Sequence, residues 1–330
     1  MAGILVAGEW NEDGLQSSTA ELLAVGRSLA SVSGAEVSVA MLGSVPESVS
    51  QEEISLGADS VYVLRDPLLN EGGLDAAVAA FEAICRQTGP EVMLFAKTEV
   101  GSEVGPRVAF RLGVGAAQDC LEVEADADSN RVVVTRPVYG GNAMARLRFP
   151  GTDPQVVVVR GKAYEPLTAD ATRQGQVVSL DVSLDPAVVK SRRVETVKAE
   201  AAGVRLEDAS VVVGGGRGLG GPEPFEQLEE LARLLGGAVG ASRAVCDAGW
   251  LDHGYQIGLT GKTITPDLYI TVGISGASQH MAGCSGAKHL IAINKDADSN
   301  IFKAASLGVV GDWKAVLPSF IETVRELVKS

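Results

Sequence analysis

Short aliphatic runs that alternate with amphipathic stretches recur along most of the chain, and this rhythm limits the fold more than any other feature. The runs "ILVAGE", "EVSVAMLG", "SVYVLRD" and "EVMLFAKT" are followed by segments such as 19–31 and 75–87, in which apolar residues recur at helical spacing. Buried aliphatic strands that alternate with helices are typical of βαβ units and of a mostly parallel sheet. The sequence therefore predicts an α/β fold.

The rhythm changes near residue 118. From there to about residue 160, strand-like runs are joined by Asp, Asn and Gly turns, which predicts a small β meander added to the parallel sheet. A polar segment follows at 165–205, and the strand–helix rhythm restarts with "SVVVGGGRG". We therefore expect two α/β domains with doubly wound sheets, 1–205 and 206–330, as a chain of 330 residues allows.

Composition and charge exclude several classes of function. The net charge is −14 at pH 7, so the chain lacks the basic surface that a nucleic-acid binder needs. The four cysteines are far apart and form no CxxC, which argues against a zinc or iron–sulfur site and favours a reducing compartment such as the cytoplasm. The apolar N-terminus is expected to be the first strand, and no apolar run is long enough to span a membrane.

Polar residues and glycines follow every aliphatic run of the second half. Because the carboxyl ends of parallel strands meet at one edge of a sheet, these residues are expected to form one extended cleft. Its two arginines and one lysine suit an anionic ligand of dinucleotide length. The polar and glycine-rich segments that follow the aliphatic runs are 214–218 with Arg217, Ser242 with Arg243, 273–276 with Ser275, 294–296 with Asn294 and Lys295, and Asp312.

Each of these features also has a simpler structural interpretation. Glycines after strands often serve only the turn, and surface arginines commonly form ion pairs. A lone histidine such as His280 is more often structural than functional. No Ser/His/Asp or Cys/His motif is recognisable, so we predict no catalytic residue and no metal ligand.

Six ordered motifs of the second half resemble one known family. "GGRGLG", "VGASRAVCDAGW", "QIGLTGK", "PDLYITVGISGASQHMAG", "IAINKDADSNIF" and "GVVGDW" are similar, in order and spacing, to the FAD domain of the electron transfer flavoprotein alpha subunit. In the first half, "GADSVYVLRDP" and "VTRPVYGGNAMARL" resemble its N-terminal domain. The resemblance extends over essentially the whole chain.

The resemblance implies a heterodimer with a beta subunit and FAD in the C-terminal domain. Such a protein accepts electrons from flavin dehydrogenases, such as acyl-CoA dehydrogenases, and passes them to a quinone reductase or another acceptor. By resemblance, Arg243 approaches the isoalloxazine ring, Thr260 lies at flavin N5, and His280 lies at the pyrimidine carbonyl. The full set of FAD contacts that it implies is Arg217, Ser242, Arg243, Ile257, Gly258, Leu259, Thr260, Ser275, Gly276, Ala277, Ser278, Gln279, His280, Asn294, Asp312 and Trp313.

Two departures from the family pattern concern the cofactor. Leu259 stands where the family usually has glutamine, so one polar contact near the flavin is missing, and "DADSNIF" replaces "DPEAPIF". Two alternative functions stay open from the sequence. One is a subunit of a flavin-based electron-bifurcating protein, and the other is a nucleotide-binding module without redox activity.

Overall fold

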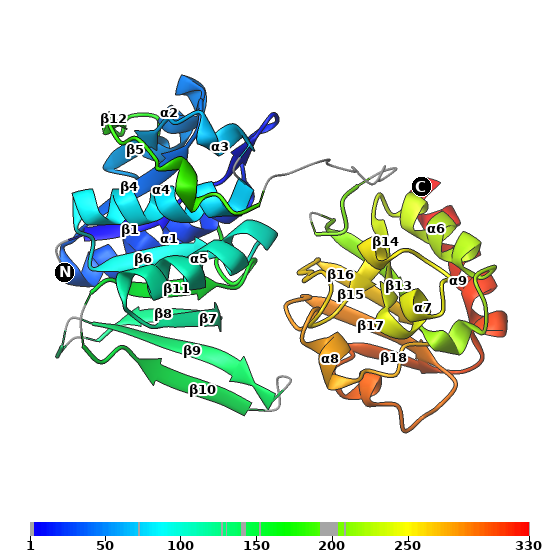
Figure 1. Cartoon of the computed structure of the whole chain (residues 1–330). Helices are drawn as coiled ribbons and strands as arrows, with labels where there is room; N and C mark the ends of the chain where they lie inside the picture. Colours follow the sequence, from blue (N-terminus) through cyan, green and yellow to red (C-terminus); the bar gives the residue numbers. More distant parts are fainter. Residues whose placement is uncertain are drawn as a thin grey trace. The chain divides into compact units, whose positions relative to one another are not determined.

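The computed structural model describes residues 3–71, 73–126, 128–129, 131–139, 143–151, 153–191, 204–207 and 209–329. Apart from Tyr139, the described residues fall into two compact units, one before and one after the stretch 192–203. Both are α/β units built on a parallel sheet, which confirms the predicted fold class (Figure 1). The expected domain boundary, near residue 205, lies where the described part of the second unit begins.

The N-terminal unit contains a seven-stranded sheet with the order β12-β5-β4-β1-β6-β11-β7, in which every neighbouring pair is parallel. A short hairpin, β2 (Trp10–Asn11) and β3 (Gly14–Leu15), follows the first strand. The sheet strands are β1 (Gly3–Ala7), β4 (Glu36–Leu42), β5 (Ser60–Leu64), β6 (Val92–Ala96), β7 (Ala116–Cys120), β11 (Gln155–Val159) and β12 (Gln176–Leu180).

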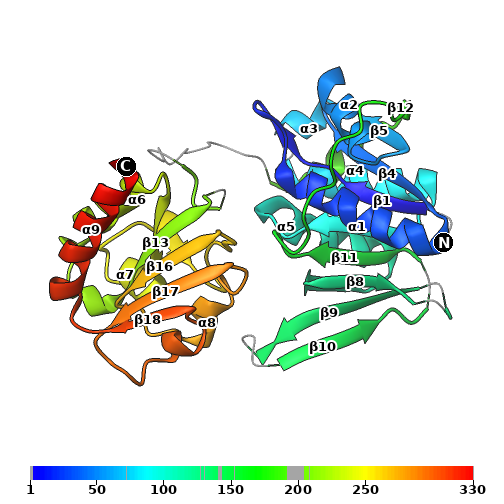
Figure 2. The same cartoon turned by 180° about the vertical axis from the view of Figure 1, so that it is seen from behind.

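Helices cover both faces of this sheet, so its strands are apolar on both sides. In β1, Ile4 and Val6 pack into the core on one face, while Leu5 and Ala7 pack into the core on the other. Figure 2 shows α1 over the first face, and Figure 1 shows α4 and α5 over the second. The helices are α1 (Ser17–Ser33), α2 (Glu47–Ser55), α3 (Leu68–Glu71), α4 (Gly73–Thr88) and α5 (Glu99–Leu112).

A separate antiparallel sheet confirms the predicted meander over 122–148, whereas the last strand-like run of that stretch, 155–159, is strand β11 of the parallel sheet, between β6 and β7. The antiparallel sheet has the order β10-β9-β8, formed by β8 (Glu122–Ala125), β9 (Val132–Val138) and β10 (Ala143–Arg148). The strand-like piece in the polar segment becomes β12, which pairs with β5 at the far edge of the parallel sheet. The described residues 165–191 of that segment therefore belong to the N-terminal unit.

The C-terminal unit contains a six-stranded parallel sheet with the order β15-β14-β13-β16-β17-β18. Five of these strands are the predicted ones, and β15 is an additional two-residue strand. Figure 2 shows β13, β16, β17 and β18 side by side. The strands are β13 (Val211–Gly215), β14 (Ala238–Ser242), β15 (Gln256–Ile257), β16 (Leu268–Val272), β17 (His289–Asn294) and β18 (Leu307–Val310).

The helices of this unit are α6 (Phe225–Leu234), α7 (Arg243–Asp247), α8 (Ser278–Met281) and α9 (Trp313–Lys329). The helix expected over 276–283 is only the four-residue α8, and the helix expected over 301–306 is a 3₁₀ turn, η5 (Asn300–Lys303). Within the described ranges, no helix combines the length and the apolarity that a membrane crossing requires.

Candidate functional site

A cavity of about 710 Å³ opens at the carboxyl edge of the C-terminal sheet. It lies around the point where the strand order reverses, because the chain passes from β13 to β14 on one side and to β16 on the other. Ligands of open α/β sheets bind at such switch points. The sequence-predicted residues that line it are Arg217, Ser242, Arg243, Ile257, Gly258, Leu259, Thr260, Ser275, Ala277, Gln279, His280 and Asn294.

Glycines allow the loops around the cavity to approach one another. A Cβ atom at Gly216 would collide with the carbonyl oxygen of Gly273, and Gly273 itself has a φ of +67°. The Gly218 N–H donates to that same carbonyl at 3.1 Å. The loop after β13 is therefore held directly against the loop after β16, an approach that only glycine allows.

Two cations face the cavity. Arg243 begins α7, and its Nε lies 3.2 Å from the Asp247 carboxylate one turn later, with both side chains more than half exposed. Such an exposed ion pair contributes little to stability, so the guanidinium can exchange this partner for an anionic or electron-rich ligand. Arg217, in the turn after β13, is also exposed. Lys295, which the sequence placed in the same cleft, is not among the lining residues.

On another wall of the cavity, the buried side-chain amide of Gln256 orients the hydroxyl of Thr260. Gln256 is only 4% exposed, and its Nε2 donates to Thr260 Oγ1 at 3.0 Å. Its Oε1 lies 3.1 Å from Nδ1 of His253. Because the threonine oxygen accepts in this bond, its own O–H remains to donate elsewhere. Sequence reasoning missed Gln256, although it opens the "QIGLTGK" motif that pointed to Thr260.

His280 lines the cavity with both ring nitrogens engaged by the protein. Its Nδ1 lies 3.1 Å from the carbonyl oxygen of Ile257, and its Nε2 lies 2.9 Å from the Tyr269 hydroxyl. A carbonyl can only accept, so Nδ1 carries the proton and Nε2 accepts from Tyr269 in the neutral ring. Burial lowers the pKa of His280 to about 4. The imidazole is therefore a neutral part of the wall.

A side-chain network holds the loop after β17 against the loop after β16. Asn294 Nδ2 donates to the Ile274 carbonyl at 2.9 Å and to Ser299 Oγ at 3.2 Å. Ser299 in turn donates to the Ser275 carbonyl at 3.1 Å. Ser299 is buried and lies within "DADSNIF", the motif in which this chain departs from the family pattern. The substituted motif thus supplies a residue that fixes the cavity wall.

Four predicted contact residues do not line the cavity. Gly276 has a φ of +74°, and a Cβ there would collide with the backbone of Ile301, so it closes the loop from behind. Ser278 Oγ contacts the neighbouring Gln279 at 3.3 Å. The roles of Gly276 and Ser278 as cofactor contacts stay predictions.

The other two residues, Asp312 and Trp313, follow the edge strand β18. Asp312 Oδ1 accepts from the backbone N–H of Lys314 at 3.0 Å, at the start of α9. Trp313 packs against the core on that helix's side of the sheet. Eight further residues line the cavity. Gly218, Gly273, Ile274 and Asp296 belong to the segments that the sequence placed in the cleft, whereas Ala244, Asp247, Gln256 and Ser299 were not singled out. Among the residues that the structure describes, no group of three or more His, Cys, Asp or Glu side chains could hold a metal ion.

An open parallel sheet with a polar cavity at its switch point defines the class of α/β proteins that bind nucleotides and nucleotide-derived cofactors. Comparison with known families narrows this class. Residues 4–185 match the family profile "Electron transfer flavoprotein domain", and residues 205–285 match "Electron transfer flavoprotein FAD-binding domain".

Relatives of known name agree with these profiles over nearly the whole chain. The electron transfer flavoprotein subunit alpha of Megasphaera elsdenii is 41% identical and covers 98% of this chain and 96% of its own. The subunits alpha of Thermoanaerobacterium thermosaccharolyticum and Bacillus subtilis are each 39% identical, with 98% of both chains covered. The chain therefore belongs to the electron transfer flavoprotein alpha-subunit family, which confirms the resemblance found in its motifs.

Proposed function

We propose that the chain pairs with a beta-type subunit, binds FAD in the 710 Å³ cavity, and works as a cytoplasmic electron carrier. In this proposal it accepts electrons from flavin dehydrogenases and delivers them to a quinone reductase or another acceptor. The observation that carries the proposal is the position of the cavity. Its lining residues from Arg217 to His280 all belong to the segment that matches the FAD-binding domain profile.

The donor set of the cavity fits FAD. A volume of about 710 Å³ lies within the range of roughly 300–1,000 Å³ that ligand sites usually have. Arg217 and Arg243 supply positive charge for a pyrophosphate. Thr260 offers a hydroxyl that its amide neighbour Gln256 orients.

FAD, when bound, supplies one- and two-electron redox chemistry, and the chain's residues bind it, orient it and tune its potential. A guanidinium at the ring favours an anionic reduced form and raises the potential, which is the role we assign to Arg243. For a one-electron couple, each ~1.4 kcal/mol of such preference corresponds to about 59 mV.

The role of His280 needs refinement. The family resemblance implies that it lies at the pyrimidine carbonyl of the flavin, where a donor is expected. With Nδ1 bonded to Ile257 and Nε2 to Tyr269, donation requires one of these bonds to be exchanged. The neutral ring therefore serves first as a fixed wall, and its role as a donor stays a prediction.

Substitution of Arg243 tests the proposal. The Arg243→Ala variant should retain FAD but lower the midpoint potential of the flavin by tens of millivolts, on the order of 59 mV per ~1.4 kcal/mol for a one-electron couple. Arg233→Ala is the matched control, because Arg233 is exposed on α6 and does not line the cavity. An unchanged flavin potential in Arg243→Ala, or an equal shift in the control, would show that Arg243 does not lie at the flavin ring.

A flavin count separates the simple carrier from its alternatives. One FAD per heterodimer fits the proposed carrier, two favour an electron-bifurcating protein, and none favours a nucleotide-binding module without redox activity. Co-expression with a beta-subunit gene, followed by quantification of the released flavin, gives this count.

A further inference from the structure

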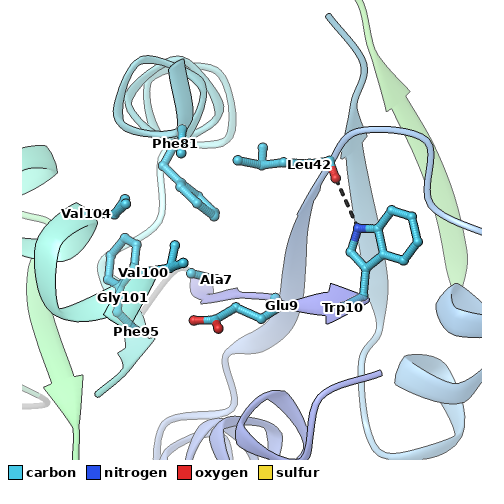
Figure 3. A pocket seen from close by; sticks show the side chains of 11 residues that line it. Ala7, Glu9, Trp10, Leu42, Phe81, Phe95, Val100, Gly101 and Val104 are labelled. Atoms are coloured by element: carbon cyan, nitrogen blue, oxygen red, sulfur yellow. Dashed lines mark hydrogen bonds between the residues drawn. The ribbon is translucent and has the colours of Figure 1, made fainter. Parts of the chain in front are cut away.

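A second cavity, of about 220 Å³, lies in the N-terminal unit and is lined only by residues of that unit (Figure 3). Strands β1, β4 and β6 each contribute residues at or just beyond their carboxyl ends, and the helices α4 and α5 supply the opposite walls. The lining residues are Ala7, Gly8, Glu9, Trp10, Leu42, Ala77, Phe81, Phe95, Val100, Gly101 and Val104.

This position is the topological switch point of the N-terminal sheet. Strand β1 lies between β4 and β6, and the chain crosses from β1 to β4 on one side but reaches β6 on the other. Crevices at such points are where open α/β sheets bind ligands. A cavity of about 150 Å³ already accepts benzene. The larger volume here has room for one ring or two fused rings.

The walls of this cavity are apolar and fixed. Phe81 and Phe95 meet edge to face, with ring centroids 5.4 Å apart and an interplanar angle of 74°. A Cβ at Gly101 would collide with the carbonyl oxygen of Ala96, so α5 packs directly on the end of β6. At the rim, Trp10 Nε1 donates to the Leu42 carbonyl at 3.1 Å. Flat apolar rings are the chemistry that such walls accept.

Glu9 is the one ionisable side chain among the lining residues. Its carboxyl group points toward Val100 and Phe95 in Figure 3. The Thr98 hydroxyl donates to Oε1 at 2.7 Å and accepts from the Gly101 N–H at 2.9 Å, so Thr98 ties Glu9 to the start of α5. Burial raises the pKa of Glu9. The protonated carboxyl is therefore more populated at a given pH than that of an exposed glutamate. In this neutral form it presents a hydroxyl donor beside a carbonyl acceptor.

We propose that this cavity binds a flat nitrogen heterocycle of one or two fused rings that carries an N–H beside an acceptor nitrogen or carbonyl. Glu9 pairs with that edge through one donated and one accepted hydrogen bond. Phe81 and Phe95 contact the ring, and Thr98 sets the orientation of the carboxyl group. A ligand of this kind makes hydrogen bonds with both the donor and the acceptor of the neutral Glu9 carboxyl, and it adds no charge to the apolar cavity.

Binding of 7-azaindole to the purified full-length, flavin-loaded protein tests the proposal, with indole as a probe that has the N–H but lacks the acceptor nitrogen. Calorimetry or ligand-observed NMR should detect saturable binding of 7-azaindole that is about tenfold tighter than that of indole. Equal affinities for the two probes, or no saturable binding of 7-azaindole, would overturn the proposal.

Three variants locate the binding. Glu9→Leu should weaken 7-azaindole by about tenfold, whereas Glu9→Gln, which keeps a donor beside an acceptor, should stay within about threefold of the unmodified chain. Glu12→Leu, at an exposed residue of the hairpin that follows Glu9, is the matched control and should leave the affinity for 7-azaindole unchanged. Loss of binding in Glu9→Gln would indicate that a carboxylate binds a cation, and unchanged binding in Glu9→Leu would place the probe elsewhere. Either result would overturn the proposal.

Discussion

His280 gives the C-terminal unit a defined sensitivity to acid. The side chain is 7% exposed, and its two nitrogens are bonded to Ile257 and Tyr269 in the neutral form. Burial lowers its pKa from 6.5 to about 4. In the unfolded chain the ring takes up a proton below about pH 6.5, but in the folded unit it does so only near pH 4. The free energy of unfolding must therefore fall as the pH falls through this window.

The size of the effect follows from the shift in pKa. Each pKa unit corresponds to ~1.36 kcal/mol, so a shift from 6.5 to about 4 removes about 3 kcal/mol between those two pH values. Above pH 6.5 both states are neutral, and this contribution no longer changes with pH. The variant His280→Gln has no ionisable group at this position, so it should lack this part of the loss of stability at low pH.

Urea unfolding followed by tryptophan fluorescence measures the difference. In a Trp10→Phe background the remaining tryptophans, Trp250 and Trp313, both report on the C-terminal unit. Between pH 6.5 and 4, this background should lose about 3 kcal/mol more stability than the same protein with His280→Gln. His289→Gln, at an exposed histidine of the same unit, is the control and should keep the full loss. If the free energy of unfolding depends on pH in the same way with and without His280, burial does not lower the pKa of this histidine.

Two further predictions concern buried positions in the two units. Glu53 is fully buried, neither of its carboxyl oxygens has a hydrogen-bond partner in the described part of the chain, and burial raises its pKa from 4.5 to about 8. Stability should therefore fall as the pH rises from 4.5 to 8, and Glu53→Gln should recover about 3 kcal/mol near pH 7 in urea unfolding; equal pH slopes would contradict this. Gly276→Ala forces a Cβ onto the backbone of Ile301 at a φ of +74° and should cost more than about 1–3 kcal/mol in thermal unfolding. Gly220→Ala, with a φ of +89° but open space around its Cβ, is the control and should cost less.

The sequence predicted the sheets and the cavity edge well because both depend on local patterns. Continuous aliphatic runs such as those of β1 and β11 are required wherever a strand is covered on both faces. Once the strands are parallel, their carboxyl ends must meet at one edge, which brings Arg217, Arg243 and Ser275 to one cavity without further information.

Other parts of the site depend on tertiary contacts that no local pattern carries. Gln256 looks like an ordinary turn residue until its burial and its bond to Thr260 are visible. Asp312 follows β18, the outermost strand on its side, and its Oδ1 accepts from the backbone at the start of α9; its role as a cofactor contact stays a prediction. The partners of His280 lie 11 and 23 residues away, so its buried, neutral state could not be predicted.

The flavin content of the purified protein decides whether this chain is an FAD-dependent electron carrier. The chain is co-expressed with a beta-subunit gene, the cofactor is released by denaturation, and its identity and amount are determined by chromatography and mass spectrometry. We expect one FAD for each alpha chain. The FAD should be lost or more weakly bound in Gly276→Ala, and retained with a lowered potential in Arg243→Ala. A colourless heterodimer that takes up no added FAD would contradict this expectation.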